Sequence, residues 1–299
     1  MLHIIVNKQP LKKIMEHKQL KRIEDYNKIL PIVEVYTAVQ SEGSRQGYPT
    51  IVIRTTGCTH RCYFGEGGWC DSWYTSIHPE KGQFTFNDII QMYEDNPHIK
   101  EMMLTGGSPT MHSALVNELT HFANEKNIFT TIETEGSHFL ATDYPIDLLS
   151  ISPKFSNSIP VIGVETPQGV ITDEKMINQH NKFRLKVDNI VDSILYHRDF
   201  HIKPVLDKDL SMVGEVEEFL EQLTDGLIEK GFGGNEWIDP LDIDEIKGWL
   251  PSKIWAMPAG DTRESLFESY GPVMNFVRDK GWRFTGRAHI MAFDTERCV

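Results

Sequence analysis

The chain has 299 residues, with 30 Lys and Arg against 43 Asp and Glu, a formal net charge of -13 and 40% hydrophobic residues. This is an ordinary globular composition, which excludes a disordered, collagen-like or low-complexity chain. The acidic surplus argues against a sequence-independent binder of nucleic acid or of an anionic membrane, because phosphate contacts need a clustered basic surface. We therefore expect a small-molecule partner.

Targeting segments and cysteines both indicate the cellular setting. No apolar stretch approaches the length of about 18 residues that a membrane-spanning helix needs, and the first apolar run is too short for a signal peptide. Four cysteines are too few for a disulfide framework in so long a chain, and Cys58, Cys62 and Cys70 fall within thirteen residues. We predict a protein of the reducing cytoplasm.

The first segment is basic. Residues 1–30 carry seven Lys or Arg and three acids, and apolar residues recur at helical spacing over 11–30. The pattern predicts an N-terminal helical extension over 1–30, followed by one large domain over 31–299. Residues 205–250 hold thirteen acids and three Lys, which is typical of a solvated helix face and loop.

Short β-branched runs then alternate with helical patterns. The predicted strands are 32–36, 51–55, 101–104, 129–132, 148–151, 183–187, 201–205, 254–257 and 288–293. The predicted helices are 88–93, 113–124, 213–223 and 266–280. This alternation favours an α/β fold with a mainly parallel sheet or partial barrel, in which ligands bind at the carboxyl ends of the strands.

Three cysteines lie in a glycine-rich loop that follows the predicted strand 51–55. Thiolates bind iron–sulfur clusters or zinc, and a cubane cluster held by three cysteines keeps one iron free for a substrate or cofactor. Zinc with His60 as fourth ligand is an alternative, although structural zinc ligands usually come in two separated pairs. The third interpretation is that these cysteines are free thiols that bind no metal.

A glycine turn, 105–109, ends the predicted strand 101–104. Its two glycines allow backbone N–H and C=O groups to approach a ligand closely. An ordinary strand-to-helix turn capped by Ser108 or Thr110 explains the same residues, so the turn alone is weak evidence for a site.

Taken together, the motifs resemble the radical S-adenosylmethionine enzymes and, within them, the 7-carboxy-7-deazaguanine synthase family. Their order and register over 32–299 make the resemblance specific. The motifs are Gln40-Ser41-Glu42-Gly43, Gly47-Tyr48-Pro49, Arg54, Gly57-Cys58, Trp69-Cys70-Asp71-Ser72, Thr105-Gly106-Gly107-x-Pro109, Glu133-Thr134-x-Gly136, Ser152-Pro153-Lys154, His201-Ile202-Lys203, and Gly286-Arg287-Ala288-His289 with the stretch to Val299.

The resemblance implies a partial (β/α)6 barrel over 31–299 as the radical S-adenosylmethionine catalytic domain. The chain departs from the family pattern in four places. Seven residues separate Cys62 from Cys70 where the family usually has two, Ser108 stands where Glu is common, and Ser41 replaces the commoner Gly. The N-terminal helix and an insertion at about 224–252 also lengthen it.

The implied reaction converts 6-carboxy-5,6,7,8-tetrahydropterin to 7-carboxy-7-deazaguanine with loss of ammonia, a carbon–nitrogen lyase step in 7-deazapurine biosynthesis of the preQ0 and queuosine type. The implied cofactors are a [4Fe-4S] cluster on Cys58, Cys62 and Cys70, S-adenosylmethionine, and Mg2+ held by Ser72. No catalytic side chain is implied beyond the cluster and cofactor. The implied partners are the pterin, an electron-donating reductase such as a flavodoxin, and a second copy in a homodimer, with neither nucleic acid nor membrane.

Residue-by-residue transfer gives two binding sets. The expected S-adenosylmethionine contacts are Gly106, Gly107, Ser108, Glu133, Ser152, Pro153, Lys154, Met257, Pro258 and Gly260. The expected substrate contacts are Val39, Gln40, Ser41, Glu42, Arg54, Thr105, His289 and Val299, the last through its terminal carboxylate.

Plainer readings compete with these roles. Arg54 could form a surface ion pair, Glu42 and Glu133 could be solvated caps, and Lys154 could merely follow a turn proline. His289 fits a core histidine equally well. We expect Cys298 to be a bystander and His60 to face solvent.

Two rival functions differ in class. A glycyl-radical-enzyme activase shares the cysteine loop but would not explain the 40–42 segment or Arg287 and His289. A non-catalytic zinc-binding interaction module would explain the cysteines alone.

Overall fold

The computed structural model describes residues 20–65, 68, 70–76, 79–166, 169–170, 173–230 and 243–299. Most of the predicted N-terminal helix, Trp69 and the centre of the insertion at about 224–252 lie outside the described residues. Residues 20–30 form turns and extended chain where a helix was expected. Within the part described, no helix is long and apolar enough to cross a membrane.

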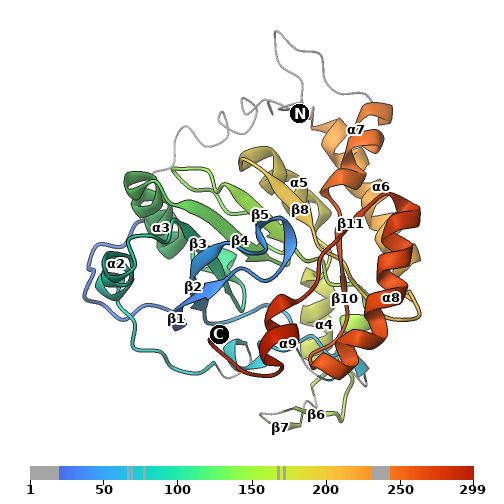
Figure 1. Cartoon of the computed structure of the whole chain (residues 1–299), viewed down its shortest axis with the longest axis horizontal. Helices are drawn as coiled ribbons and strands as arrows, with labels where there is room; N and C mark the ends of the chain where they lie inside the picture. Colours follow the sequence, from blue (N-terminus) through green and yellow to red (C-terminus); the bar gives the residue numbers. More distant parts are fainter. Residues whose placement is uncertain are drawn as a thin grey trace.

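A six-stranded sheet forms the centre of the molecule, with the order β1-β2-β3-β4-β5-β8 (Figure 1). β1 pairs antiparallel with β2, and all other neighbours pair parallel. The expectation of an α/β fold with a mainly parallel sheet is confirmed. The strands are β1 (Ile32–Val39), β2 (Pro49–Thr55), β3 (Glu101–Gly106), β4 (Phe129–Thr134), β5 (Leu148–Ile151) and β8 (Phe200–Ile202).

A smaller parallel sheet extends this layer. It has the order β11-β10-β9, with β9 (Val205–Leu206), β10 (Trp255–Pro258) and β11 (Arg283–Phe284). A parallel bridge between Ile202 and Ile254 joins the end of β8 to the segment that leads into β10. The parallel run thus continues from β2 to β10. A two-stranded hairpin, β6 (Glu165–Thr166) and β7 (Gly169–Val170), lies apart from both sheets.

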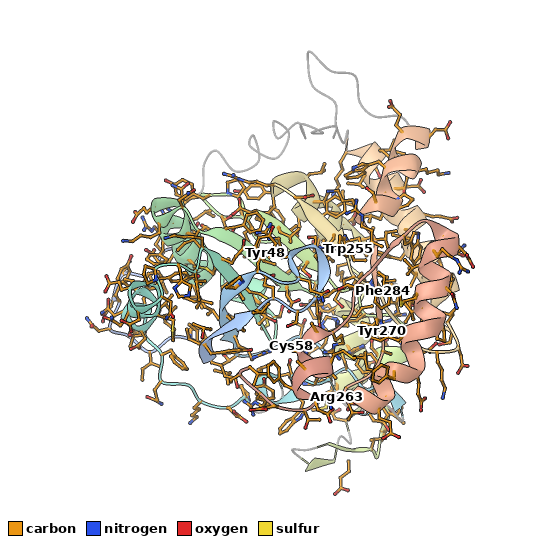
Figure 2. All side chains as sticks on the ribbon, in the orientation of Figure 1. Tyr48, Cys58, Trp255, Arg263, Tyr270 and Phe284 are labelled. Carbon is orange, nitrogen blue, oxygen red and sulfur yellow. The ribbon has the colours of Figure 1, made fainter. Side chains whose placement is uncertain are left out.

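Helices flank the sheets, with α2 and α3 at one end of the molecule and α6, α7 and α8 at the other (Figure 1). At the second end, Tyr270 and Phe284 pack edge to face between α8 and β11, with ring centroids 5.1 Å apart (Figure 2). The helices are α2 (Phe86–Asp95), α3 (Ser113–Lys126), α4 (Glu174–Phe183), α5 (Val187–Tyr196), α6 (Val213–Glu229), α7 (Ile243–Trp249), α8 (Arg263–Lys280) and α9 (Ala288–Phe293). Short 3-10 turns are η1 (Gly43–Arg45), η3 (Trp73–Thr75), η4 (Pro109–Met111), η5 (Ser156–Ser158) and η6 (Leu250–Lys253).

The core lies between the sheet and these helices. Parallel strands covered on both faces read as continuous apolar runs, and Ile51, Val52 and Ile53 of β2 are all buried. Helix α3 contributes Leu119 and α6 contributes Phe219, both buried in the same apolar cluster. This packing fixes the strand ends on which the site is built.

Two predicted strands are wrong. The run 183–187 is the junction between α4 and α5, and 288–293 is the short helix α9. Residues 183–187 alternate apolar and basic side chains, and 288–293 is a mostly apolar run of six residues. At such short lengths periodicity cannot separate a strand from a turn of helix. α9 and the C-terminus instead lie beside β1 (Figure 1).

The connection between β1 and β2 turns back toward the interior of the sheet. Gly43 lies there with φ of +68°, donates its N–H to Thr285 Oγ1 at 2.6 Å, and faces His201 of β8. A Cβ at this position would lie 2.4 Å from Cε1 of His201. Only glycine combines this backbone conformation with so close an approach.

Gly43→Ala should therefore lower the free energy of unfolding by about 1–3 kcal/mol more than Gly47→Ala, as measured by denaturant titration. Both residues have positive φ and carry the same backbone penalty, but a Cβ at Gly47 would meet no atom within 4 Å. Equal losses in the two variants would contradict the packing against His201.

Candidate functional site

The cysteine loop follows β2, and Cys58 lies at the edge of the central sheet (Figure 2). Its long Cys62–Cys70 segment closes on itself: Phe64 donates its N–H to Gly68 O at 2.7 Å, and Cys70 donates its N–H to Cys62 O at 3.2 Å. The described residues at the two ends of this segment therefore meet. Cys62 and Cys70 lie side by side in spite of the seven residues between them.

Cys62 is buried, and Cys58 and Cys70 are half-buried. Burial raises the pKa of Cys58 to about 12 and that of Cys70 to about 11, and it raises the pKa of Cys62 well above its usual value. The neighbouring thiols add to this effect at Cys62. Because the thiolate is the ligand form, a cationic group bound here would supply the charge that stabilises it.

The donor set of this loop is three cysteine thiols, which suits an iron–sulfur cluster because each thiolate can ligate a different iron atom. In the described ranges, no three His, Cys, Asp or Glu side chains converge tightly enough to ligate one metal ion. One zinc ion needs all its ligand atoms within about 2.0–2.3 Å, whereas a cubane spreads three thiolates over separate iron atoms.

We expected His60, the candidate fourth zinc ligand, to face solvent. This expectation is wrong. His60 is buried, its Nδ1 shares a hydrogen bond with Thr59 Oγ1 at 3.2 Å, and its ring packs edge-on against His180 at 5.0 Å. Burial is the main reason that the pKa of His60 falls to about 2. The ring is thus a packed neutral group of the loop.

Residues far along the chain hold the cysteine loop in place. His180 of α4 accepts the N–H of Arg61 at Nδ1, 3.2 Å away, and its Nε2 lies 3.0 Å from Ser158 Oγ. Ser158 O in turn accepts the N–H of Tyr63 at 3.0 Å. Two backbone groups between and beside the first two cysteines are therefore fixed by η5 and α4.

The glycine turn lies directly against the residue that precedes Cys58. Ser108 donates its N–H to Gly57 O at 2.7 Å, and a Cβ at Gly107 would lie 2.0 Å from that oxygen. Gly106, with φ of +115°, approaches Thr55 in the same way. The turn that ends β3 and the loop that follows β2 are thus brought together at one edge of the sheet.

One further predicted segment, 152–154, reaches the same edge. Lys154, after β5, donates to Ser152 Oγ at 3.0 Å, and its charge lowers the pKa values of Cys62 and Cys70 against the larger effect of burial. Pro153 lies buried between them.

Glu135, to which the sequence gave no role, lies between the glycine turn and the cysteine loop. Its carboxylate is 6% exposed and accepts a hydrogen bond from Ser108 Oγ at 2.7 Å. After burial, the charge of Glu135 is the largest influence that raises the pKa of Cys58. It occupies the unspecified position of the Glu133-Thr134-x-Gly136 motif, which is why the pattern did not reveal it.

Lys203 joins the predicted substrate and cofactor residues. Its Nζ lies 2.5 Å from Glu42 Oε2 and 2.7 Å from Glu133 Oε1, and Thr105 donates to the other oxygen of Glu133 at 2.9 Å. Burial alone would raise the pKa of Glu42, but Lys203 and Arg287 together lower it to about 2. The His201-Ile202-Lys203 motif was the signal for this residue, although its role was not inferred.

Arg287 extends the ionic network to two other segments. Its guanidinium donates to Glu42 Oε1 at 3.0 Å, to Gly260 O at 2.7 Å and to the Asp71 carboxylate. Burial raises the pKa of Asp71, but Arg287 brings it far below its usual value. Gly260 follows β10, whose last residues, Met257 and Pro258, were predicted beside the cofactor.

Arg54 and Ser72 lie together beside Asp71. Arg54 donates to Glu34 Oε2 at 2.7 Å, to the Tyr36 hydroxyl at 3.0 Å and to Ser72 Oγ at 3.3 Å. Ser72 Oγ also donates to Asp71 Oδ1 at 3.2 Å. Arg54 therefore does form an ion pair, but one that is largely buried and adjoins the cysteine loop.

The remaining predicted substrate residues divide between two places. Val39, Ser41, His289 and Val299 line a cavity of about 440 Å³ beside α9. Gln40 instead is buried and donates to Glu101 Oε2 at 3.3 Å, near the start of β3. The volume suits a bicyclic ligand.

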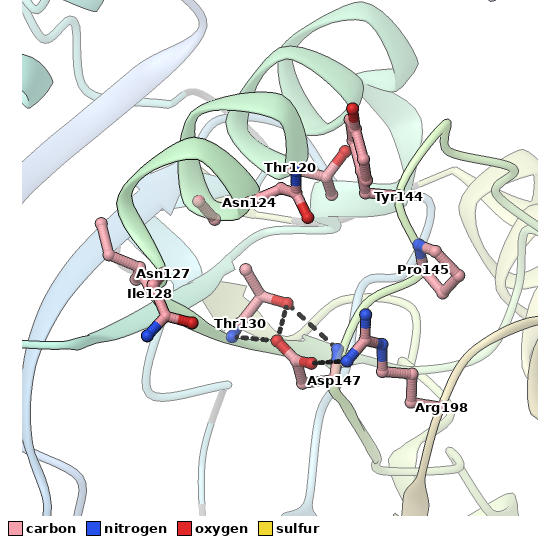
Figure 3. A pocket seen from close by; sticks show the side chains of 10 residues that line it. Thr120, Asn124, Asn127, Ile128, Thr130, Tyr144, Pro145, Asp147 and Arg198 are labelled. Atoms are coloured by element: carbon pink, nitrogen blue, oxygen red, sulfur yellow. Dashed lines mark hydrogen bonds and ion pairs between the residues drawn. The ribbon is translucent and has the colours of Figure 1, made fainter.

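A second, smaller cavity of about 80 Å³ lies at the opposite edge of the sheet, where β4 and β5 begin (Figure 3). There Asp147 accepts hydrogen bonds from both the N–H and the hydroxyl of Thr130, and lies 3.4 Å from Arg198. These side chains satisfy one another, and none of the predicted site residues lines this cavity.

Comparisons with known proteins were made on sequence and on structure. No family model matches. The chain is 31% identical to the 7-carboxy-7-deazaguanine synthase of Halobacterium salinarum over 87% of this chain and 89% of that protein. It is 28% identical to the synthase of Rhodopirellula baltica over 72% and 80% of the two chains. A crystal structure of QueE from Escherichia coli superposes with a TM-score of 0.49 and 18% identity, over 87% of this chain and 94% of that chain.

Lys203→Met should lower the free energy of unfolding by about 3–5 kcal/mol, because it removes the ammonium group between two carboxylates that pack around it. Lys208→Met is the matched control. Its ion pair with Glu268 is exposed, so its loss should leave stability almost unchanged. Denaturant titration of both variants measures the difference, and a small effect at Lys203 would contradict the burial of this network.

Acid should destabilise the folded protein through the buried His201. Burial, with the charges of Lys203 and Lys253, lowers its folded pKa to about 3, so below pH 6.5 the unfolded chain binds a proton that the folded chain does not. The free energy of unfolding then falls as pH decreases from 6.5 towards 3. His201→Gln should flatten this slope by about 1.4 kcal/mol per pH unit, and replacement of the exposed His98 should not.

Proposed function

Because the chain belongs to the 7-carboxy-7-deazaguanine synthase family, an enzyme family of 7-deazapurine biosynthesis, we propose that it converts 6-carboxy-5,6,7,8-tetrahydropterin to 7-carboxy-7-deazaguanine with loss of ammonia. The observation that supports this most directly is the meeting of the cysteine loop, the glycine turn and the Glu42 network at one edge of the sheet. The reaction class is that of a radical S-adenosylmethionine lyase.

In this proposal Cys58, Cys62 and Cys70 ligate a [4Fe-4S] cluster, and S-adenosylmethionine lies against the glycine turn. When bound, the two supply a carbon-centred radical that takes a hydrogen atom from the substrate. The protein's own part is placement and the exclusion of water. Ser152, Pro153, Lys154, Glu133 and the end of β10 surround the same space.

The substrate assignments follow from charge and hydrogen-bonding capacity. Glu42, held as a carboxylate, can accept the paired N–H groups of a guanine-like ring. Arg54 can pair with the substrate carboxylate, and a Mg2+ ion on Ser72 would assist it, since Mg2+ takes oxygen ligands and few of them from protein. Thr105, His289 and the residues around the 440 Å³ cavity would complete the contacts.

We further propose that the six strands from β2 to β10 that run parallel form a partial (β/α)6 barrel, with β1 as an additional antiparallel strand. The continuous pairing from β2 to β8 and the bridge to Ile254 support this. An electron-donating reductase such as a flavodoxin, a cytoplasmic location and a homodimer belong to the same proposal.

Anaerobic loading with iron and sulfide should give a brown protein, which forms 5'-deoxyadenosine and 7-carboxy-7-deazaguanine when a reductant, S-adenosylmethionine and the pterin are supplied. Cys62→Ala should abolish both the colour and the products. Cys298→Ala, at an exposed cysteine, should retain them. A colourless wild-type protein, or a coloured one that makes no product from the pterin, would overturn the proposed function.

A further inference from the structure

Three buried glutamates can be compared. Within the described part of the chain, Glu101, Glu118 and Glu135 are the buried carboxylates, at 6%, 1% and 6% exposure. Arg45 pairs with Glu101, and Arg22 pairs with Glu118 at 2.8 Å. A buried carboxylate normally needs such a partner, because its removal from water is costly.

Glu135 has no such cation. Among the described residues, no Lys or Arg lies within 4.0 Å of its carboxylate, and its one close hydrogen bond comes from the neutral Ser108 hydroxyl. His60 Nδ1 is 3.9 Å away, beyond hydrogen-bonding distance, and is already engaged with Thr59. Among the described residues, the Glu135 carboxylate is thus buried with one hydrogen bond from a neutral hydroxyl and with no Lys or Arg partner.

The position of Glu135 indicates which kind of ligand could pair with its carboxylate. Glu135 lies against the glycine turn through Ser108, whose N–H also donates to Gly57 O, directly before Cys58. Glu133, the other carboxylate on this segment, already has one oxygen at Lys203 and the other at Thr105. A cationic ligand that enters between the cysteine loop and the glycine turn therefore meets Glu135 as the carboxylate without a partner.

We propose that Glu135 binds the α-ammonium group of S-adenosylmethionine. This inference rests on the proposed function and assigns a residue of that site that the motifs did not indicate. S-adenosylmethionine carries an ammonium group, which can form a charge-assisted hydrogen bond with the free side of the carboxylate. Ser108 then orients Glu135 through its hydroxyl. The residue touches cofactor and sets its position; it takes no part in bond cleavage.

Affinity tests the proposal directly. In equilibrium dialysis with anaerobically loaded protein, Glu135→Gln should bind S-adenosylmethionine about 10- to 100-fold more weakly than the wild type. Wild-type protein should discriminate against the analogue that lacks the amino group, and Glu135→Gln should lose most of that discrimination. Iron content should be unchanged in the variant.

Glu101→Gln is the matched control, since Glu101 is equally buried but paired with Arg45 near the other end of β3. It should leave the affinity unchanged. The double variant Ser108→Glu with Glu135→Asn, which moves the carboxylate to the neighbouring turn, should recover part of the affinity and of the discrimination.

Stability of the cofactor-free protein separates ligand binding from a structural role. Glu135→Gln should leave the thermal midpoint unchanged or raise it, because it removes an uncompensated charge, whereas Glu101→Gln should lower it. Equal affinity of Glu135→Gln and wild type, or a loss of stability like that of Glu101→Gln, would overturn the inference alone. Failure of the loaded wild type to bind S-adenosylmethionine would overturn the proposed function with it.

Discussion

The ammonium group of Lys203 is the contact on which the rest of the site depends. It lies buried between Glu42, from the connection between β1 and β2, and Glu133 of β4. Burial alone would favour neutral carboxylic acids there, and the cation reverses that preference at Glu42. Arg287 shares Glu42 and carries the network to Asp71, so the cysteine loop, β4, β8 and β10 are tied through one set of charges. A defect in this network would disturb both halves of the proposed site.

In the lengthened cysteine loop, Cys62 and Cys70 remain neighbours although seven residues separate them in the sequence. Backbone hydrogen bonds close the additional residues on themselves, so that Cys70 returns to Cys62. The fixed points of the loop are then its contacts with other elements, namely Gly57 against the glycine turn and Arg61 against His180. Spacing between the cysteines is therefore a weaker constraint than the position of the backbone on either side of them.

Most of the sheet could be predicted from sequence, because buried parallel strands are continuous β-branched runs and the topology brings their carboxyl ends together. The same argument predicted that Cys58 and the glycine turn lie at one edge of the sheet. It failed at α9, where a run of six residues, five of them apolar, is too short to carry a usable period. It could not reveal the partners of Lys203 or the isolation of Glu135, because the presence or absence of an ion pair depends on residues distant in sequence.

The pairing of Glu42 with Arg287 joins residues 245 positions apart, and the contact of Gly43 with Thr285 joins residues 242 apart. Such contacts form late, because closing a very long loop costs conformational entropy before the contact can stabilise the fold. During synthesis, the central strands can pair while Glu42 still lacks its arginine. The edge of the sheet that carries the proposed site is accordingly completed last, and a ribosome-bound chain has its scaffold well before this site is complete.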